Sequence, residues 1–254
     1  MMAVLKKELT IIFSQPLLYI IAAVFSLIAG ILFYSLLLNY IGNVQDQLQQ
    51  LDSAMKLQLI TSQLIFPLIG NINFLMMVLV PAMVMNAMSD EYKNGTFPLL
   101  VHSALSPWVF IMAKFFAYVL ALAFVLSTIV IFPLLLWYSG IYEYSFLLLG
   151  FMAVLFNIAF FVALGLWCSS LTQHPVLAMF ITYAVILAHW LFPSIKELTN
   201  NLWWMGVFDY LSCSKHFESL VKGNISGSTI GFYVVHIALF LSLARISWSK
   251  KLLS

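Results

Sequence analysis

Charged residues are scarce in this sequence. Only 8% of its 254 residues are Asp, Glu, Lys or Arg, whereas 63% are hydrophobic, and the mean hydropathy is +1.04. Because roughly a quarter of the residues of a soluble domain are charged, this composition excludes an ordinary soluble enzyme and is typical of a chain embedded in a bilayer. The net charge of +2 is small and no basic run concentrates it, so nothing points to a nucleic-acid partner.

Cysteine is also rare, and common catalytic motifs are missing. Cys168 lies near the end of a predicted span and Cys213 in a polar loop predicted on the opposite side, so we expect no disulfide between them. The sequence has no H-E-x-x-H, C-x-x-C or G-x-S-x-G motif, and no G-x-x-x-x-G-K-S/T loop for ATP phosphates. No Asp or Glu lies deep in a predicted span, which argues against a proton-coupled secondary transporter. We therefore expect no enzyme activity, catalytic residue, metal or cofactor in this chain.

Long apolar segments are what the sequence has instead. Six of them are long enough to cross a hydrocarbon core of about 30 Å as helices, whereas barrel strands would be about half as long. The predicted spans lie near residues 17–38, 64–88, 112–137, 147–170, 175–193 and 229–245. The first span is too long for a signal-peptide core, and the chain has no internal repeat or low-complexity linker. We predict one all-α transmembrane domain over residues 1–254, a six-helix bundle.

The basic residues predict the orientation of this bundle. Seven of them fall on one side of a six-span layout and four on the other. Since basic residues are enriched in cytoplasmic loops, both termini are predicted to be cytoplasmic. The larger group comprises Lys6, Lys7, Lys93, Lys114, Arg245, Lys250 and Lys251, and the smaller one comprises Lys56, Lys196, Lys215 and Lys222.

Three segments outside the spans are predicted to lie along the membrane surface. Residues 2–14 place apolar and basic side chains on opposite helical faces and end before Pro16, which predicts a short interfacial helix. Residues 44–59 repeat apolar residues at helical spacing and predict an amphipathic outer connection. The loop over residues 193–228 mixes aromatic and charged residues, which suits helices that lie at, or dip into, the outer interface.

The connection between spans two and three is predicted to be cytoplasmic and reads SDEYKNGTFPLLVHSALSPWVFIMAK over residues 89–114. Gly95 predicts the end of one helix, and Thr96 is a candidate cap for a short helix that follows it. Ser106 and Pro107 then predict the start of the next helix. The apolar face of the short helix comprises Phe97, Leu99, Leu100 and Leu105. Such a helix either docks into a partner or lies on the lipid surface, and the pattern alone leaves both open.

This connection contains, in order, an acidic pair, a basic residue, Gly-Thr, an apolar run and P-x-x-x-x-x-x-K. That order resembles the signature after span two in ABC type-2 (ABC-2) exporter permeases. The N-terminal KKELTIIFSQPLLYIIAAVFSLIAGILF and the segment LSCSKHFESLVKGNISGSTIGFYVVHIALFLSL, residues 211–243, are similar to the gliding-motility (Gld) branch of that family. Pro98 departs from the pattern, since relatives commonly have an acidic residue there. The signature is carried by Asp90, Glu91, Lys93, Gly95, Thr96, Pro107 and Lys114, and the outer-loop match by Leu211, Ser212, His216, Phe217, Glu218, Lys222 and Gly223.

The resemblance implies the permease subunit of an ATP-driven exporter in the bacterial inner membrane. Such a subunit pairs with a second permease subunit and two copies of an ABC ATPase, which hold ATP and Mg²⁺ and push on the cytoplasmic coupling helix. An extracytoplasmic accessory protein is a further expected partner. Charged residues at the rim would register the ATPase surface, while Phe97 and Leu100 would be buried anchors. The implied coupling residues are Asp90, Glu91, Lys93, Gly95, Thr96, Phe97, Leu99 and Leu100.

Other functions remain open from the sequence. His189 and His236 fall in spans five and six, where they would ligate a haem as in an anchor of a respiratory complex; the preferred alternative is that each hydrogen-bonds a neighbouring helix. A mechanical or assembly subunit without transport is the other alternative. The apolar spans and the lack of a charged pocket favour a lipid-like or peptide-like cargo over a small ion. Four asparagines are the main polar candidates inside the predicted bundle: Asn71, Asn73, Asn86 and Asn157. Two roles are open for them, lining a translocation path or forming hydrogen bonds between neighbouring helices.

Overall fold

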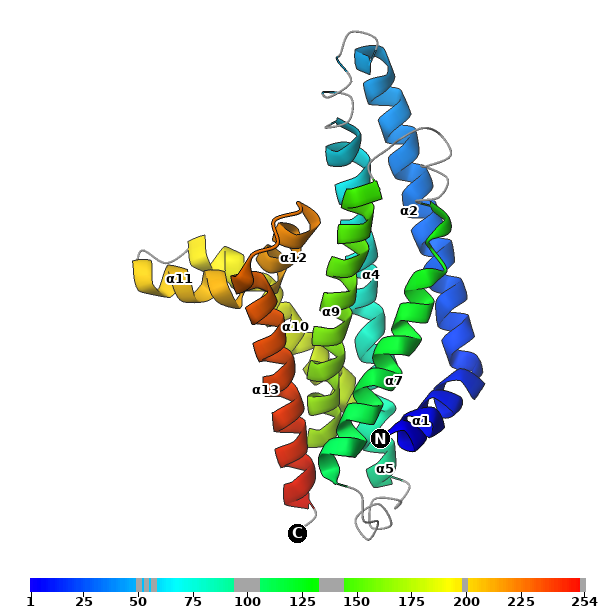
Figure 1. The fold of residues 1–254 in the computed structure, drawn as a ribbon, viewed down its shortest axis with the longest axis vertical. Coiled ribbons are helices and arrows are strands. Elements are labelled where there is room, and N and C mark those ends of the chain that lie inside the picture. Colours follow the sequence, from blue (N-terminus) through cyan, green and yellow to red (C-terminus); the bar gives the residue numbers. More distant parts are fainter. Residues whose placement is uncertain are drawn as a thin grey trace.

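The structure is a computed structural model, and it describes residues 1–48, 52, 55, 59–93, 106–132, 144–197 and 201–251. Every regular element in this described part is a helix (Figure 1). The elements are α1 (Met2–Ser14), α2 (Pro16–Leu48), the π-helix η1 (Thr61–Ile65), α4 (Phe66–Val84), α5 (Asn86–Lys93), α7 (Pro107–Ser127), α9 (Tyr144–Leu171), α10 (Pro175–Glu197), α11 (Leu202–Leu211), α12 (Cys213–Val221) and α13 (Gly227–Lys251).

Within the described residues, six stretches are long and apolar enough to cross a membrane. They follow the order of the six predicted spans, so the prediction of an all-α bundle with six spanning helices is confirmed. The stretches are Pro16–Gly42, Thr61–Ser89, Pro107–Ser127, Phe146–Leu171, Pro175–Ile195 and Gly227–Ser249.

The third span differs from its predicted range of residues 112–137. The helix begins at Pro107, where proline occupies the first turn and needs no partner for an N–H group, and it ends at Ser127. Beyond that point the amides of Thr128 and the next two residues bond three residues back instead of four. Bonds to the third residue back give the tighter 3₁₀ pattern and end the α-helix. Hydropathy does not reveal this change because the segment stays apolar.

The first span also runs further than predicted. α2 continues without a break to Leu48, beyond the spanning stretch that ends at Gly42, so the start of the predicted amphipathic connection, residues 44–59, prolongs this helix. Most of the rest of that connection lies outside the described residues.

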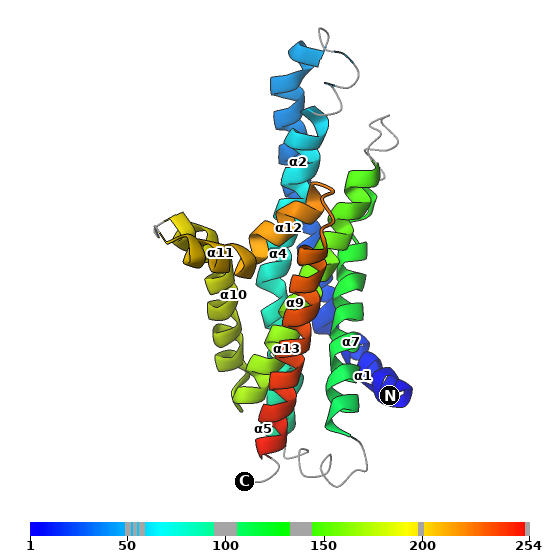
Figure 2. The same ribbon diagram turned by 60° about the vertical axis from the view of Figure 1, so that its left-hand side comes forward.

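Helix α9 lies at the centre of the bundle (Figure 2). It contacts α4, α7, α10, α12 and α13, and 61% of its spanning window is buried, against 22% for α2 and 17% for α10. Glycine brings α4 close to α9, because a Cβ atom at Gly150 would lie 2.0 Å from Ile69 Cδ1. Close backbone approach at small residues is the usual way in which membrane helices pack.

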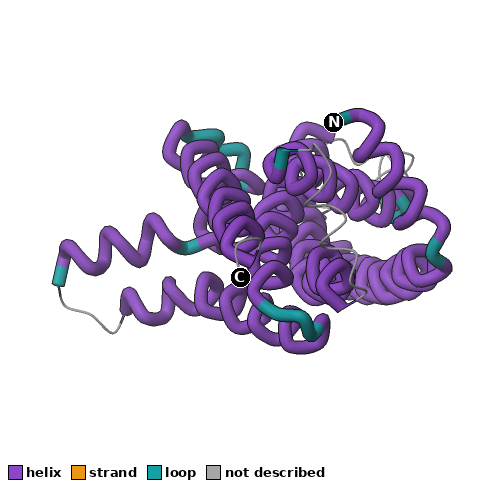
Figure 3. Tube along the Cα trace, turned by 90° about the horizontal axis from the view of Figure 1, so that it is seen from below, coloured by secondary structure: helices purple, strands orange, loops and turns teal. Residues whose placement is uncertain are grey.

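Both termini lie at one end of the bundle, which we call the terminal end (Figure 1). At this end α1 packs across the first turns of α7. α5 also ends here, and α7 begins here. Ile12 of α1 is buried while Lys6 and Lys7 are exposed, which matches the two predicted faces of this helix. Away from this end, α11 projects sideways from the bundle beside α10 (Figure 3), and α12 follows it.

Candidate functional site

The connection predicted to contact a partner joins two described helices at the terminal end. α5 ends at Lys93, and α7 begins at Pro107 after the extended residue Ser106, so the predicted helix start is confirmed. Asp90 lies in α5, but its side chain and that of Lys93 are outside the described part. The predicted coupling residues that lie wholly outside the described part are Gly95, Thr96, Phe97, Leu99 and Leu100.

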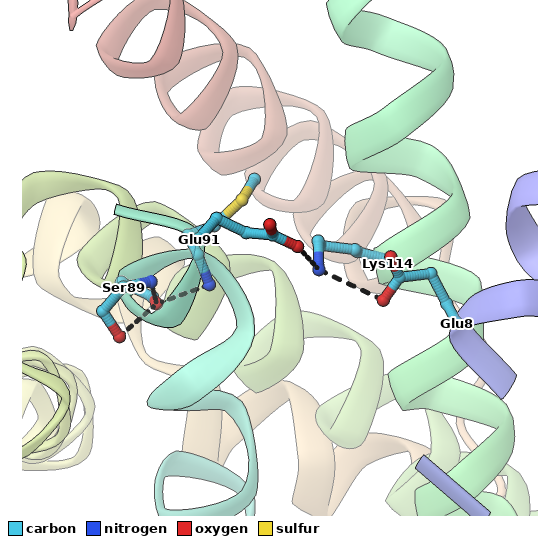
Figure 4. Close-up of polar contacts among 6 residues, drawn as sticks. Glu8, Ser89, Glu91 and Lys114 are labelled. Atoms are coloured by element: carbon cyan, nitrogen blue, oxygen red, sulfur yellow. Dashed lines mark hydrogen bonds and ion pairs between the residues drawn. The ribbon is translucent and has the colours of Figure 1, made fainter. Parts of the chain in front are cut away.

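Lys114 of α7 joins three helices at this end (Figure 4). Its Nζ donates to Glu8 Oε2 of α1 at 3.1 Å and to Glu91 Oε1 of α5 at 3.2 Å. The side chains of Lys114 and Glu8 are 6% and 7% exposed, and that of Glu91 is 23% exposed. The ammonium also lies 4.8 Å from the centre of the Phe110 ring, a favourable cation–π distance. We call Glu8, Glu91 and Lys114 the Lys114 cluster; these partners offset the high cost of burying the ammonium.

Two members of this cluster could be singled out from the sequence, and the third was not predicted. Glu91 and Lys114 belong to the predicted signature, and folding brings them together from the two sides of the connection. Glu8 lies three residues after Leu5 and four before Ile12, on the apolar face of α1. An acidic residue on that face was the signal for a buried basic partner, whereas the prediction for this helix rested only on its basic and apolar residues.

A break at Met85 separates α4 from α5. Pro81 has no N–H group, so one bond is missing from the helical ladder. Further along, Ser169 Oγ of α9 accepts from the amides of Met88 and Ser89 at 3.0 and 3.1 Å and donates to Met85 O at 2.9 Å. A side chain inserted into the ladder bends a helix. α5 is therefore a separate short helix directly after α4, and its first residues still belong to the second spanning stretch, Thr61–Ser89.

A cavity of about 360 Å³ opens beside the Lys114 cluster. Residues of α1, of α2 and of the bend at Gln15 between them line one side, and residues of α4, α5 and α7 line the other. Polar groups such as Lys7, Glu8 and Asn86 line it together with apolar ones such as Ile11 and Leu17. We call it the terminal-end cavity.

A second cavity of about 360 Å³, the central cavity, lies among α4, α9, α10 and α12. Asn71, Asn73 and Asn157 line it, as does Ser214 of α12, and its described lining residues carry no formal charge. Three of the four predicted polar candidates thus meet at one cavity, whereas Asn86 lies at the terminal-end cavity.

Asn157 is the centre of a buried hydrogen-bond network at the central cavity. Its Nδ2 donates to Asn73 Oδ1 at 2.9 Å, and its Oδ1 accepts from Tyr233 Oη at 2.8 Å and from Cys213 Sγ at 3.1 Å. Burial raises the pKa of the Cys213 thiol to about 12, so the thiol stays protonated and donates. Cys168 and Cys213 are both free, as predicted, and both are buried. The network ties α4, α9, α12 and α13 together.

The outer-loop match falls mainly on α12. His216 is buried, and its Nε2–H donates to Tyr210 O at 2.9 Å, so Nδ1 is left to accept from Thr229 Oγ1 at 3.3 Å. Burial lowers the pKa of His216, which favours this neutral form. Phe217 is buried and lines the central cavity, while Glu218 is exposed and pairs with Lys222 at 2.5 Å.

Gly223 ends α12. Its φ of +80° lies in the left-handed region, and the amide of Asn224 bonds Ser219 O at 2.9 Å. This is the glycine-terminated helix end that satisfies the last carbonyls of a helix.

The comparison with protein families decides which kind of membrane protein this is. A family model described as ABC-2 type transporter matches residues 1–225. The chain belongs to the ABC-2 type transporter family. This ABC-2 protein is accordingly the membrane-spanning permease component of an ABC transporter. A comparison with curated proteins finds no match, and the gliding-motility branch stays a prediction.

The two membrane histidines of this ABC-2 permease bond within their own helices. His189 Nδ1 lies 2.9 Å from Val185 O, and His236 Nδ1 lies 2.8 Å from Phe232 O. The prediction that each bonds a neighbouring helix is therefore wrong, because the carbonyl one turn back on the same helix is within reach. The two rings lie 6.2 Å apart and both contact Phe160. Membership of the ABC-2 family favours a permease over the haem-binding anchor.

Proposed function

We propose that this ABC-2 permease couples ATP hydrolysis by a separate ABC ATPase to the export of a substrate across the bacterial inner membrane. The observation that carries the proposal is the Lys114 cluster. Glu91 lies near the end of α5 and Lys114 lies two turns into α7, so their ion pair holds together both helices that carry the connection of residues 94–105. Glu8 adds α1 to the same unit.

The cluster gives a physical route for force from an ATPase into the bundle. Separating Lys114 from its carboxylates would leave a buried charge unpaired, at a cost of about 3–5 kcal/mol. A push on residues 94–105 would therefore move α5, α7 and α1 together. The break at Met85 supplies the joint about which α5 turns relative to α4.

The central cavity is our candidate for part of the translocation path. Its carboxamide and hydroxyl groups come from Asn71, Asn73, Asn157 and Ser214, and the remaining wall is largely apolar. A charged cargo would lie unpaired in such a site. An amphipathic cargo without formal charge at this point, lipid-like or peptide-like, fits the lining best.

Orientation and partners complete the proposal. The terminal end would face the cytoplasm, as the basic residues predict, and would bind two ATPase copies that hold ATP and Mg²⁺. A second permease subunit, identical or not, would complete the membrane part. The poorly buried helices α2 and α10 offer surface for it.

Co-purification tests the proposal. The permease is extracted in mild detergent with the ABC ATPase encoded nearest to it, and wild type is compared with the double variant Phe97→Asp, Leu100→Asp. Ile225→Asp is the control, because Ile225 is an exposed apolar residue between α12 and α13, away from the terminal end. We expect the ATPase to bind wild type and the control but not the double variant.

Two results would contradict the proposal. If the wild-type permease retains no ABC ATPase, the proposal has no partner that supplies energy from ATP. Equal retention by a monodisperse double variant would show that residues 94–105 are not the contact.

A further inference from the structure

The terminal-end cavity has chemistry that the ion cluster beside it does not use. Glu8 is 5% exposed and lines this cavity. Of the two carboxylate oxygens of Glu8, only Oε2 accepts a hydrogen bond from Lys114, and no described residue donates one to Oε1. A buried carboxylate oxygen without a donor costs free energy, and a cationic donor satisfies it best.

A basic group lines the same cavity. Lys7 is exposed and forms no ion pair with a described residue. Gln15 and Asn86 add amide donors to the lining. The cavity therefore has an acceptor for a cation at Glu8 and donors for an anion around Lys7.

The remaining lining is apolar and lies beside spanning helices. Ile11 of α1, Leu17 of α2 and Met83 of α4 contribute to it. Leu17 belongs to the first membrane span and Met83 to the second. A molecule with a zwitterionic end and a hydrocarbon tail would match both parts of the lining.

We propose that the terminal-end cavity binds the headgroup of a phospholipid that carries a primary ammonium, of the phosphatidylethanolamine type. The ammonium donates to Glu8 Oε1, the phosphate faces Lys7 and the neighbouring amides, and the acyl chains lie along the apolar lining. Phosphatidylcholine has no N–H donor for Glu8, and phosphatidylglycerol has no ammonium. The two charges of the headgroup match the two signs in the cavity, and its binding requires no ATPase.

Native mass spectrometry of the full-length permease tests this proposal. The protein is delipidated in mild detergent and titrated separately with phosphatidylethanolamine, phosphatidylcholine and phosphatidylglycerol that share the same acyl chains. We expect phosphatidylethanolamine to bind about fivefold more tightly than either of the others, since losing a hydrogen bond to a charged group at a partly solvated site costs about 1 kcal/mol. Glycerophosphoethanolamine, which lacks acyl chains, is the water-soluble competitor and should not displace the lipid at equal concentration.

The lysine pair supplies a matched control. Lys6 and Lys7 are adjacent, exposed and equally charged, but only Lys7 lines the cavity. Lys7→Gln should weaken phosphatidylethanolamine binding about fivefold and Lys6→Gln should leave it unchanged. Glu8→Gln should remove the preference over phosphatidylcholine.

Three results would each overturn the proposal. Equal affinity for the three lipids would show that they coat the apolar surface of the bundle without recognition of the headgroup. Equal effects of the two lysine substitutions would place the lipid elsewhere. Displacement by the water-soluble competitor at equal concentration would show that no acyl chain is recognised.

Discussion

Removing the Lys114 ammonium should strongly destabilise the permease. Lys114→Met keeps most of the aliphatic length of the side chain but leaves Glu8 and Glu91 without their shared cation. Removing one partner of a fully buried ion pair costs about 3–5 kcal/mol. Glu8 is almost fully buried whereas the Glu91 side chain is 23% exposed, so water screens part of the loss and we expect about 3 kcal/mol.

Equilibrium unfolding in mixed detergent micelles, followed by tryptophan fluorescence, measures this loss. Lys6→Met is the control, because Lys6 is exposed on α1 and such substitutions change the free energy of unfolding by about 0.5 kcal/mol or less. Adding Glu8→Gln to Lys114→Met should recover at least part of the stability, since it removes the most deeply buried unpaired charge. A loss below about 1 kcal/mol for Lys114→Met, or no recovery in the double variant, would refute the assignment of a buried cluster.

Three further predictions concern other parts of the bundle. Ser169→Ala should lower the free energy of unfolding by about 1–3 kcal/mol, because two amides of α5 lose their acceptor; an unchanged unfolding curve would show that the inserted hydroxyl does not stabilise the joint. Gly223→Ala should cost about 1 kcal/mol because of its positive φ, whereas Gly227→Ala, with open space around the added methyl group, should not; equal costs would contradict the role given to the left-handed turn. Burial lowers the pKa of His216, so the unfolded chain binds a proton that the folded chain does not. Stability should therefore fall as the pH drops below the ordinary histidine pKa of about 6.5, and His216→Gln should reduce this dependence in unfolding measured at several pH values.

The fold could be predicted in large part because a bilayer constrains a sequence strongly. Low charge and six long apolar runs leave a helical bundle as the main solution. The ends of the helices were harder, because they depend on local bonds. The end of α7 at Ser127 lies inside an apolar run, and the break at Met85 depends on Ser169, a residue far away in the sequence.

The candidate site shows the same division. Lys114 and Glu91 could be singled out from the spacing of polar residues around the connection, but their shared partner Glu8 lies in a separate helix. The meeting of Asn73 and Asn157 depends on how α4 packs on α9, which no local pattern contains. The histidine partners were predicted wrongly because the nearest carbonyl is on the same helix.

We propose that motion at residues 94–105 reaches α1 through the Lys114 cluster. Spin labels at Lys6→Cys on α1 and Ile225→Cys beyond α12, with both native cysteines replaced by serine, report the separation of these two sites by pulsed electron paramagnetic resonance. In the permease bound to its ATPase, we predict that trapping the ATPase with ATP and vanadate changes this separation, and that Glu8→Gln, which keeps the Lys114–Glu91 pair, abolishes the change. An unchanged separation in the otherwise unaltered permease, or the same change with Glu8→Gln, would contradict the account.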